Sequence, residues 1–108
     1  MIEVTFDKKN GKLTGFTFDG HAGYAEYGKD IVCAGVSSLV LNTINSIECF
    51  CKDDKFTLDT KENDGFIAFS LSKDPSKEAS LLLNSLELGV KSIKESYKEH
   101  ICLNYREV

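Results

Sequence analysis

The fold of this chain is decided by residues 30–50, DIVCAGVSSLVLNTINSIECF. Apolar side chains recur there at spacings of three and four residues, which predicts an amphipathic or largely buried helix of about five turns. Asp30 has a side chain preferred at a helix N-cap, and Asp53 and Asp54 close the helix. We expect this helix to pack against a sheet built from the segments on either side of it.

The segment before this helix predicts a β-hairpin. Residues 2–6 alternate between apolar and polar, which is the period of a half-buried strand. The Asn10-Gly11 pair adopts the positive φ angles of a tight turn at little cost, and residues 13–18 continue as the second strand. Gly15 within that strand predicts a bulge or a close approach of two backbones.

The segment after the helix predicts a second hairpin, a second helix and a last strand. Residues 56–60 and 66–71 are strand-like and are separated by a polar turn that ends in Asp-Gly. The second helix is expected to have Pro75 in its first turn, and Gly89 predicts close packing against the sheet or the other helix. Residues 100–107 alternate again as the final strand.

The resulting order, ββαββαβ, predicts a single α+β domain over residues 1–108, with both helices covering a mostly antiparallel sheet. No apolar run approaches the ~20 residues that span a bilayer, so we expect no membrane segment. The net charge of −4 argues against a nucleic-acid-binding surface, which normally carries a basic patch. An acidic chain is steered instead towards a basic partner or peptide.

The oxidation state of the cysteines depends on the cellular compartment of the protein. The N-terminus lacks the basic and apolar regions of a signal peptide, so we expect a cytoplasmic protein whose four cysteines stay reduced. Cys49-x-Cys51 and His100-x-Cys102 supply zinc-type ligands, but residues two apart on a helix point about 200° from each other. Structural zinc sites usually place their cysteines at C-x₂₋₄-C spacing in a turn. We therefore expect no metal and no cofactor, and assign no role to these three cysteines.

One histidine and one cysteine form the candidate catalytic pair. His21 follows a glycine at the end of a predicted strand, and Cys33 lies in the predicted first helical turn. A thiol at that position is near the positive end of the helix dipole, which favours the nucleophilic thiolate. An imidazole within hydrogen-bond reach would activate the thiol and later protonate the leaving amine. From the residues alone, Cys33 is either the nucleophile of a His21/Cys33 pair or a small buried apolar residue of the helix.

The helix start supplies supporting candidates. The backbone N–H groups of Cys33 and Ala34 lie near the exposed end of the predicted helix, where they are suited to an oxyanion hole. Ser37 is four residues after Cys33 and shares its helix face. Asp30 either caps the helix only or also orients His21, as in a triad.

The loop between the pair, residues 19–30, contains three of the eight glycines and no hydrophobic period. Loops of this length in a small domain usually carry function, so we expect this one to contact the substrate. The residues assigned to this substrate loop are Gly20, Ala22, Gly23, Tyr24, Tyr27 and Gly28.

The segments GHA at residues 20–22 and DIVCAGVS at residues 30–37 resemble the paired motifs of the ribosomal-processing cysteine proteases, the Prp family of Firmicutes and related bacteria. Two motifs at this separation are specific, and the likeness in length and element order covers essentially the whole chain. Gly35 stands where the family often has a second alanine. This small-for-small change is not expected to harm activity.

The resemblance implies a His21/Cys33 dyad, with Asp30 and Ser37 as further site members. It implies a cysteine endopeptidase that removes the N-terminal extension of a large-subunit ribosomal protein, cutting after a hydrophobic, phenylalanine-containing sequence. It also implies a homodimer. With a phenylalanine-containing substrate, Tyr24 and Tyr27 either close over an aromatic substrate side chain or anchor the loop itself.

Two alternatives to this protease stay open at the level of sequence. One is a non-enzymatic ribosome- or RNA-associated binding module, which the negative charge and the lack of a basic stripe disfavour. The other is a different thiol enzyme, such as an acyltransferase, because the same nucleophile serves both reactions.

Overall fold

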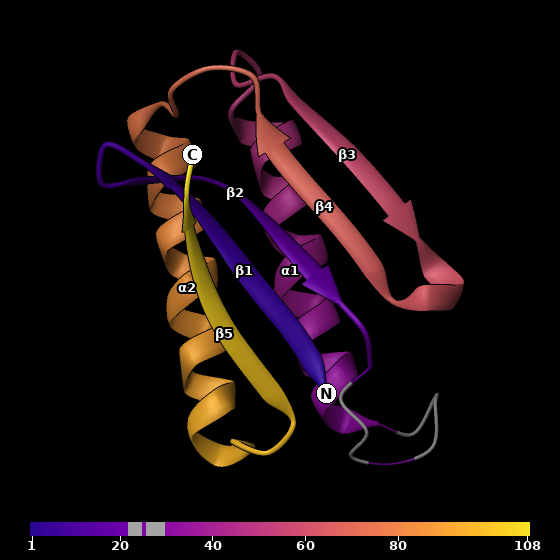
Figure 1. Ribbon diagram of the computed structural model, residues 1–108. Helices are drawn as coiled ribbons and strands as arrows, with labels where there is room; N and C mark the ends of the chain where they lie inside the picture. The colour runs from indigo at the N-terminus through magenta and orange to yellow at the C-terminus, as the bar shows by residue number, and fades with distance from the viewer. Residues whose placement is uncertain (22–24, 26–29) are drawn as a thin grey trace.

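The computed structural model describes residues 1–21, Ala25 and residues 30–108. Its element order confirms the predicted ββαββαβ arrangement, with one short 3₁₀ turn, η1, added between the third and fourth strands (Figure 1). The elements are β1 (Ile2–Lys9), β2 (Lys12–Asp19), α1 (Ile31–Phe50), β3 (Phe56–Lys61), η1 (Glu62–Asp64), β4 (Phe66–Leu71), α2 (Lys77–Ser96) and β5 (Ile101–Glu107).

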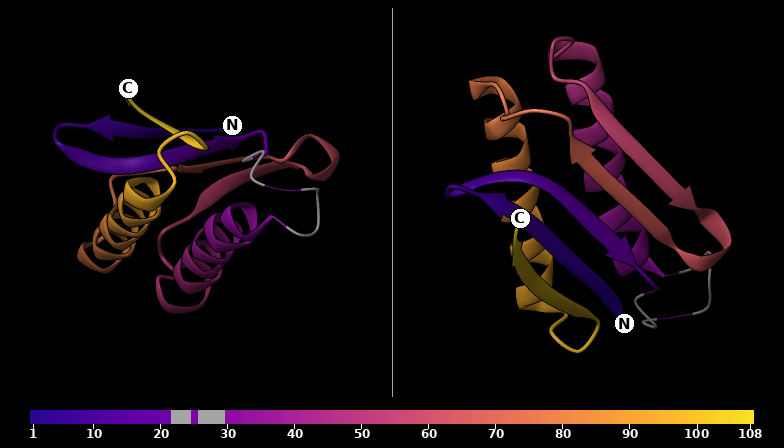
Figure 2. Two further views of the ribbon diagram at one scale, coloured as in Figure 1. Left: turned by 90° about the horizontal axis from the view of Figure 1, so that it is seen from below. Right: turned by 45° about the horizontal axis from the view of Figure 1, so that its top comes forward.

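The five strands form one sheet in the order β3-β4-β2-β1-β5. Neighbouring strands are antiparallel except β1 and β5, which are parallel because α2 carries the chain back across the sheet. Both helices lie on the same face, α1 under the β3–β4 side and α2 under the β1–β5 side (Figure 2). The predicted α+β class and the mostly antiparallel sheet are therefore confirmed.

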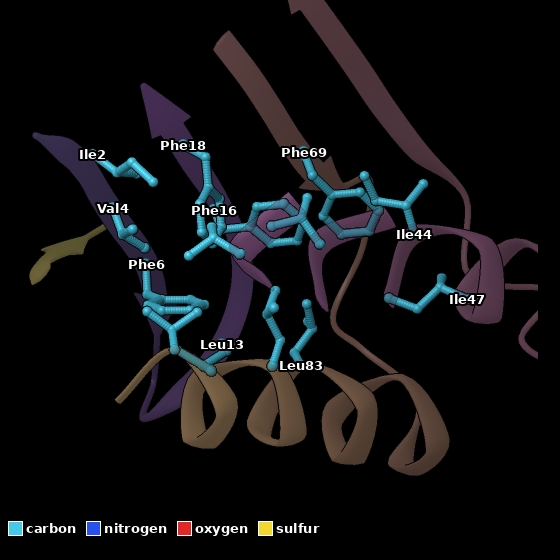
Figure 3. Close-up of a cluster of buried hydrophobic side chains, with 14 of the residues drawn as sticks. Ile2, Val4, Phe6, Leu13, Phe16, Phe18, Ile44, Ile47, Phe69 and Leu83 are labelled. Carbon is cyan, nitrogen blue, oxygen red and sulfur yellow. The ribbon is translucent and has the colours of Figure 1, made fainter. Parts of the chain in front are cut away.

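The core fills the space between the sheet and the two helices. Alternate residues of the strands point to the helices, so that Val4, Phe6 and Phe16 are completely buried (Figure 3). Phe16 stacks on Phe69 of the neighbouring strand at a ring-centroid distance of 4.9 Å. The helices contribute apolar side chains such as Ile47 of α1 and Leu83 of α2, which complete the core.

The close approaches predicted at Gly15 and Gly89 are confirmed. A Cβ atom on Gly15 would lie 2.5 Å from the carbonyl oxygen of Phe69, so β2 and β4 can approach this closely only at a glycine. A Cβ atom on Gly89 would lie 2.8 Å from Leu39 Cδ1, which shows that α2 packs closely against α1 at this point. The Asn10-Gly11 turn also forms as predicted, with φ angles of 54° and 80°.

The predicted start of the second helix was wrong by about one half turn. Pro75 precedes the helix, and Ser76 is the N-cap, because its hydroxyl oxygen accepts the N–H of Ala79 at 3.1 Å. Asp54 holds this cap in place: its carboxylate accepts the Ser76 N–H at 2.9 Å and the Ser76 hydroxyl at 2.5 Å. No local sequence pattern indicates a contact between residues 22 positions apart. The prediction relied on the position of Pro75 alone and therefore placed the helix start too early.

The expectation about apolar runs also needs correction. Among the described residues, α1 is the one helix long and apolar enough to cross a membrane, with a mean hydropathy of 1.3 over its best window. Core helices pass the same test, and one face of α1 packs into the core through Val32, Val36 and Val40.

Substituting two glycines should change stability in opposite directions. Gly15→Ala should lower the free energy of unfolding by roughly 1–3 kcal/mol, because the new methyl group meets the backbone of β4. Gly35→Ala should raise it by about 0.5–1 kcal/mol, because this helical position has only Ile93 Cδ1 nearby, at 3.5 Å. Urea unfolding measures both, and equal effects of the two variants would contradict the packing described here.

Tyr105 should ionise only at high pH. It lies on β5, and its hydroxyl donates to Glu87 of α2. Burial, that hydrogen bond and the Glu87 charge raise the pKa of Tyr105 from 10.0 to about 12. The neutral phenol is therefore favoured by folding, so its contribution to stability is complete below pH 10 and is lost as the pH rises towards 12.

The tyrosinate absorbance titration should contain one late component that disappears in Tyr105→Phe. If all tyrosines titrate together near pH 10, the predicted pKa of Tyr105 is wrong.

Candidate active site

The start of α1 is built around a buried carboxylate. Asp30 Oδ1 accepts the N–H groups of Val32 at 2.9 Å and of Cys33 at 3.0 Å, and the Asp30 side chain is almost inaccessible to solvent. This confirms Asp30 as the N-cap. The cap fixes the first helical turn and with it the position of Cys33, whose side chain is half-buried.

His21 is positioned by a close contact between two hairpins. Gly20, just beyond β2, has a φ of 95°, and its N–H donates to the carbonyl oxygen of Gly65 at 3.1 Å. A Cβ atom on Gly65 would lie 3.0 Å from His21 Cε1 and 2.6 Å from the Gly20 carbonyl oxygen. The imidazole therefore lies against the turn between β3 and β4, where only a glycine leaves room for it.

One cavity of about 370 Å³ brings the predicted pair together. His21 enters from the end of β2 and Cys33 from the first turn of α1, and both line its wall. Ser37 lines it as well, which confirms that Ser37 and Cys33 share a helix face. The remaining lining residues are Ile2, Phe18, Gly20, Val36, Val40, Leu41, Thr60, Gly65, Phe66 and Ile67. We call this space the His21–Cys33 cavity.

The predicted oxyanion hole is not available in this structure. The N–H of Cys33 donates to the Asp30 carboxylate, and the N–H of Ala34 donates to the Asp30 carbonyl oxygen at 3.0 Å. Both donors therefore already have an acceptor. The error has a physical cause: a side chain that caps a helix uses the N–H groups that would otherwise bind an anion. The second role considered for Asp30, orienting His21, stays a prediction.

Five of the predicted substrate-loop residues, Ala22, Gly23, Tyr24, Tyr27 and Gly28, lie outside the described residues. The sixth, Gly20, is described and lines the cavity. Two features require a glycine at position 20. Its φ angle is positive, and a Cβ atom there would lie 2.8 Å from the Met1 carbonyl oxygen.

Sequence reasoning missed one wall of the cavity. Thr60, Phe66 and Ile67 come from the β3–β4 hairpin, which carried no functional expectation. The Asp64-Gly65 pair did predict a turn, but nothing local indicates that this turn packs against the end of β2.

Comparison with known proteins shows to which family the chain belongs. Residues 1–102 match the family described as cysteine protease Prp. The chain belongs to this family. The resemblance seen in the GHA and DIVCAGVS segments and the predicted enzyme class, a cysteine protease, are thereby confirmed. Membership of an enzyme family decides against the alternative of a non-enzymatic binding module.

One relative, known by its sequence and by two crystal structures, illustrates the match to the Prp family. The chain is 32% identical over 105 residues to the ribosomal processing cysteine protease Prp of Staphylococcus aureus, which covers 97% of each chain. A crystal structure of Prp from S. aureus with a covalently linked product peptide superposes with a TM-score of 0.92, at 34% identity and coverage of 98% and 100%. Another, with a substrate peptide, has a TM-score of 0.86, at 32% identity and the same coverage.

The other cysteines of this Prp family member are in different surroundings. Cys49 is exposed and Cys51 is buried, so the two thiols differ in their access to solvent. Burial raises the pKa of the Cys51 thiol, and the nearby carboxylates of Asp54 and Glu78 raise it further. Within the described ranges, no three His, Cys, Asp or Glu side chains are grouped so as to hold a metal ion.

Alkylation rates should separate the four thiols. Below pH 9 we expect iodoacetamide to modify Cys33 first, because it shares a cavity with His21, the predicted base, and Cys51 last, because burial and two carboxylates raise its pKa. Exposed Cys49 should fall between them. Mass spectrometry of digested protein measures each site, and equal rates at all four would show that no thiol is activated in the unliganded protein.

Proposed function

We propose that residues 1–108 form a single cysteine endopeptidase domain that removes the N-terminal extension of a large-subunit ribosomal protein, with Cys33 as nucleophile and His21 as base. The observation that carries this proposal is the meeting of both side chains in one cavity, although they come from different elements. The family match supplies the reaction class. The name of the S. aureus relative, a ribosomal processing protease, supports the substrate.

The walls of the cavity support an apolar peptide as the substrate. Phe18, Val36 and Ile67 line it, and they suit a hydrophobic side chain next to the bond that is cut. The S. aureus structures hold a substrate peptide and a covalently linked product peptide, which is the outcome expected of a nucleophilic mechanism. The net charge of −4 favours a basic segment of a ribosomal protein over a nucleic acid.

The proposed reaction is acyl transfer through a thioester. His21 takes the proton of the Cys33 thiol, and the thiolate attacks the carbonyl carbon of the scissile peptide bond. His21 then gives its proton to the departing amine, and the acyl group stays on the sulfur. Water, deprotonated by His21, hydrolyses the thioester and regenerates the thiol. Since Asp30 occupies the N–H groups of Cys33 and Ala34, other donors must stabilise the oxyanion.

We further propose that the protease acts in the cytoplasm, where ribosomal proteins are made, and that it is a homodimer. The reduced state that its cysteine chemistry needs supports the first proposal. Size-exclusion chromatography with light scattering tests the second, and a monomer at all concentrations would contradict it.

Cleavage of an extension peptide tests the catalytic roles. The wild-type protein should release the extension, and Cys33→Ala should give no detectable cleavage because no thioester can form. His21→Ala should lower kcat/KM by roughly 10²–10⁴-fold, the usual contribution of a general base. Mass spectrometry identifies the products.

Cys102→Ala is the matched control for this assay. Cys102 is on β5, at the other edge of the sheet, and its thiol contacts Asn104. This variant should cleave at the wild-type rate. Cleavage by Cys33→Ala, or its loss in Cys102→Ala with the fold intact, would overturn the assignment of the nucleophile.

A further inference from the structure

Two large apolar side chains are exposed beside the His21–Cys33 cavity. Leu41 of α1 is 51% exposed and lines the cavity itself, while Leu58 of β3 is 45% exposed. Leu58 pairs with Phe69, which is buried against the helices, so Leu58 points to the same face of the sheet as the cavity. Both side chains are therefore accessible to an apolar group of a molecule bound in the cavity.

These leucines lie along one seam between α1 and the edge strand β3. The cavity is at one end of the seam, where Thr60 of β3 and Leu41 of α1 both line it. A second hollow of about 380 Å³ is at the other end, where Phe56 of β3 meets Glu48 and Cys51 at the end of α1. The helix and the strand therefore run in opposite directions along this seam, and Leu58 lies between its two hollow ends.

The seam has the right dimensions for an extended peptide. Leu41 is eight residues after Cys33 on the same helix, which places it about 12 Å further along the axis. An extended chain advances about 3.3–3.4 Å per residue, so this distance corresponds to between three and four substrate residues. Leu58 lies two strand residues beyond Thr60, or roughly two further substrate residues.

We propose that Leu41 and Leu58 form a specificity subsite that binds apolar side chains of the substrate at a distance from the scissile bond. Leu41 contacts the side chain three or four residues from that bond, and Leu58 contacts one about two residues further on. This inference rests on the proposed protease function. The occupant is the substrate itself, because Leu41 lines the cavity that contains the proposed nucleophile, and Leu58 lies two residues from Thr60, which also lines it, on the same face of β3.

The exposed leucines of α2 give a matched control. Leu88 is 67% exposed on a helix surface, and it does not line the His21–Cys33 cavity. If exposure alone mattered, Leu88→Ala would behave like Leu41→Ala. Since Leu88 lies on α2, away from the proposed path of the substrate, we expect Leu88→Ala to leave kcat/KM unchanged for every peptide.

The test measures kcat/KM for a set of peptides with wild-type protein, Leu41→Ala, Leu58→Ala and Leu88→Ala. Each peptide carries the ribosomal-protein extension with one residue changed to alanine, at positions one to six on either side of the cut. Leu41→Ala should lower kcat/KM for the unmodified peptide by roughly tenfold, the size of a lost hydrophobic contact. It should have no effect on the peptide that already has alanine at the position Leu41 contacts.

Two results would overturn the subsite. One is an equal loss with every peptide, which means a general disturbance of the enzyme. The other is no loss with any peptide. Thermal unfolding of each variant shows whether the fold is intact, which is expected because both leucines are half exposed.

A binding measurement keeps the subsite testable if the wild-type protein cleaves none of the peptides. Fluorescence anisotropy of the labelled unmodified peptide then compares Cys33→Ala with Cys33→Ala carrying Leu41→Ala. Weaker binding by the double variant supports the subsite even though the proposed substrate fails. Equal binding by the two, or binding by neither, overturns the subsite.

Discussion

The structure of the candidate site depends on one buried carboxylate. Asp30 accepts the N–H groups of Val32 and Cys33, and its own carbonyl oxygen accepts the N–H of Ala34. Burying a carboxylate costs free energy unless hydrogen-bond donors such as these surround it. The Asp30 carboxylate is therefore held in the position where both N–H groups reach it. The cap sets the residue at which α1 begins, and the helix then holds Cys33 at the cavity wall. The same bonds occupy the amides that a helix start would offer to an oxyanion.

A second constraint is the contact between the β1–β2 and β3–β4 hairpins. Gly20 and Gly65 share a hydrogen bond, and neither position has room for a Cβ atom. The contact brings His21 against the β3–β4 turn and makes that hairpin a wall of the cavity. His21 and Cys33 are thus held by separate parts of the backbone, which meet only when the sheet has formed.

Local patterns predicted the elements well and the contacts between them poorly. Strand alternation and helical spacing identified all seven main elements, since the burial of one face imposes those periods. Gly15 and Gly89 were correctly assigned to close approaches, but their partners, Phe69 and Leu39, had no local signal. The start of α2 was misplaced for the same reason, because its cap is held by Asp54 at the end of the other helix.

The sequence by itself determined the order of the elements, the Asp30 cap and, through two short motifs, the family to which the chain belongs. These features are local, since hydrophobic period, capping and motif spacing act over a few residues along the chain. Only the tertiary structure decided that His21 and Cys33 line one cavity, that the β3–β4 hairpin forms one wall of it, and that Leu41 lines it as well. Such contacts arise when distant segments bury their apolar faces together, and no local pattern specifies which segments will meet.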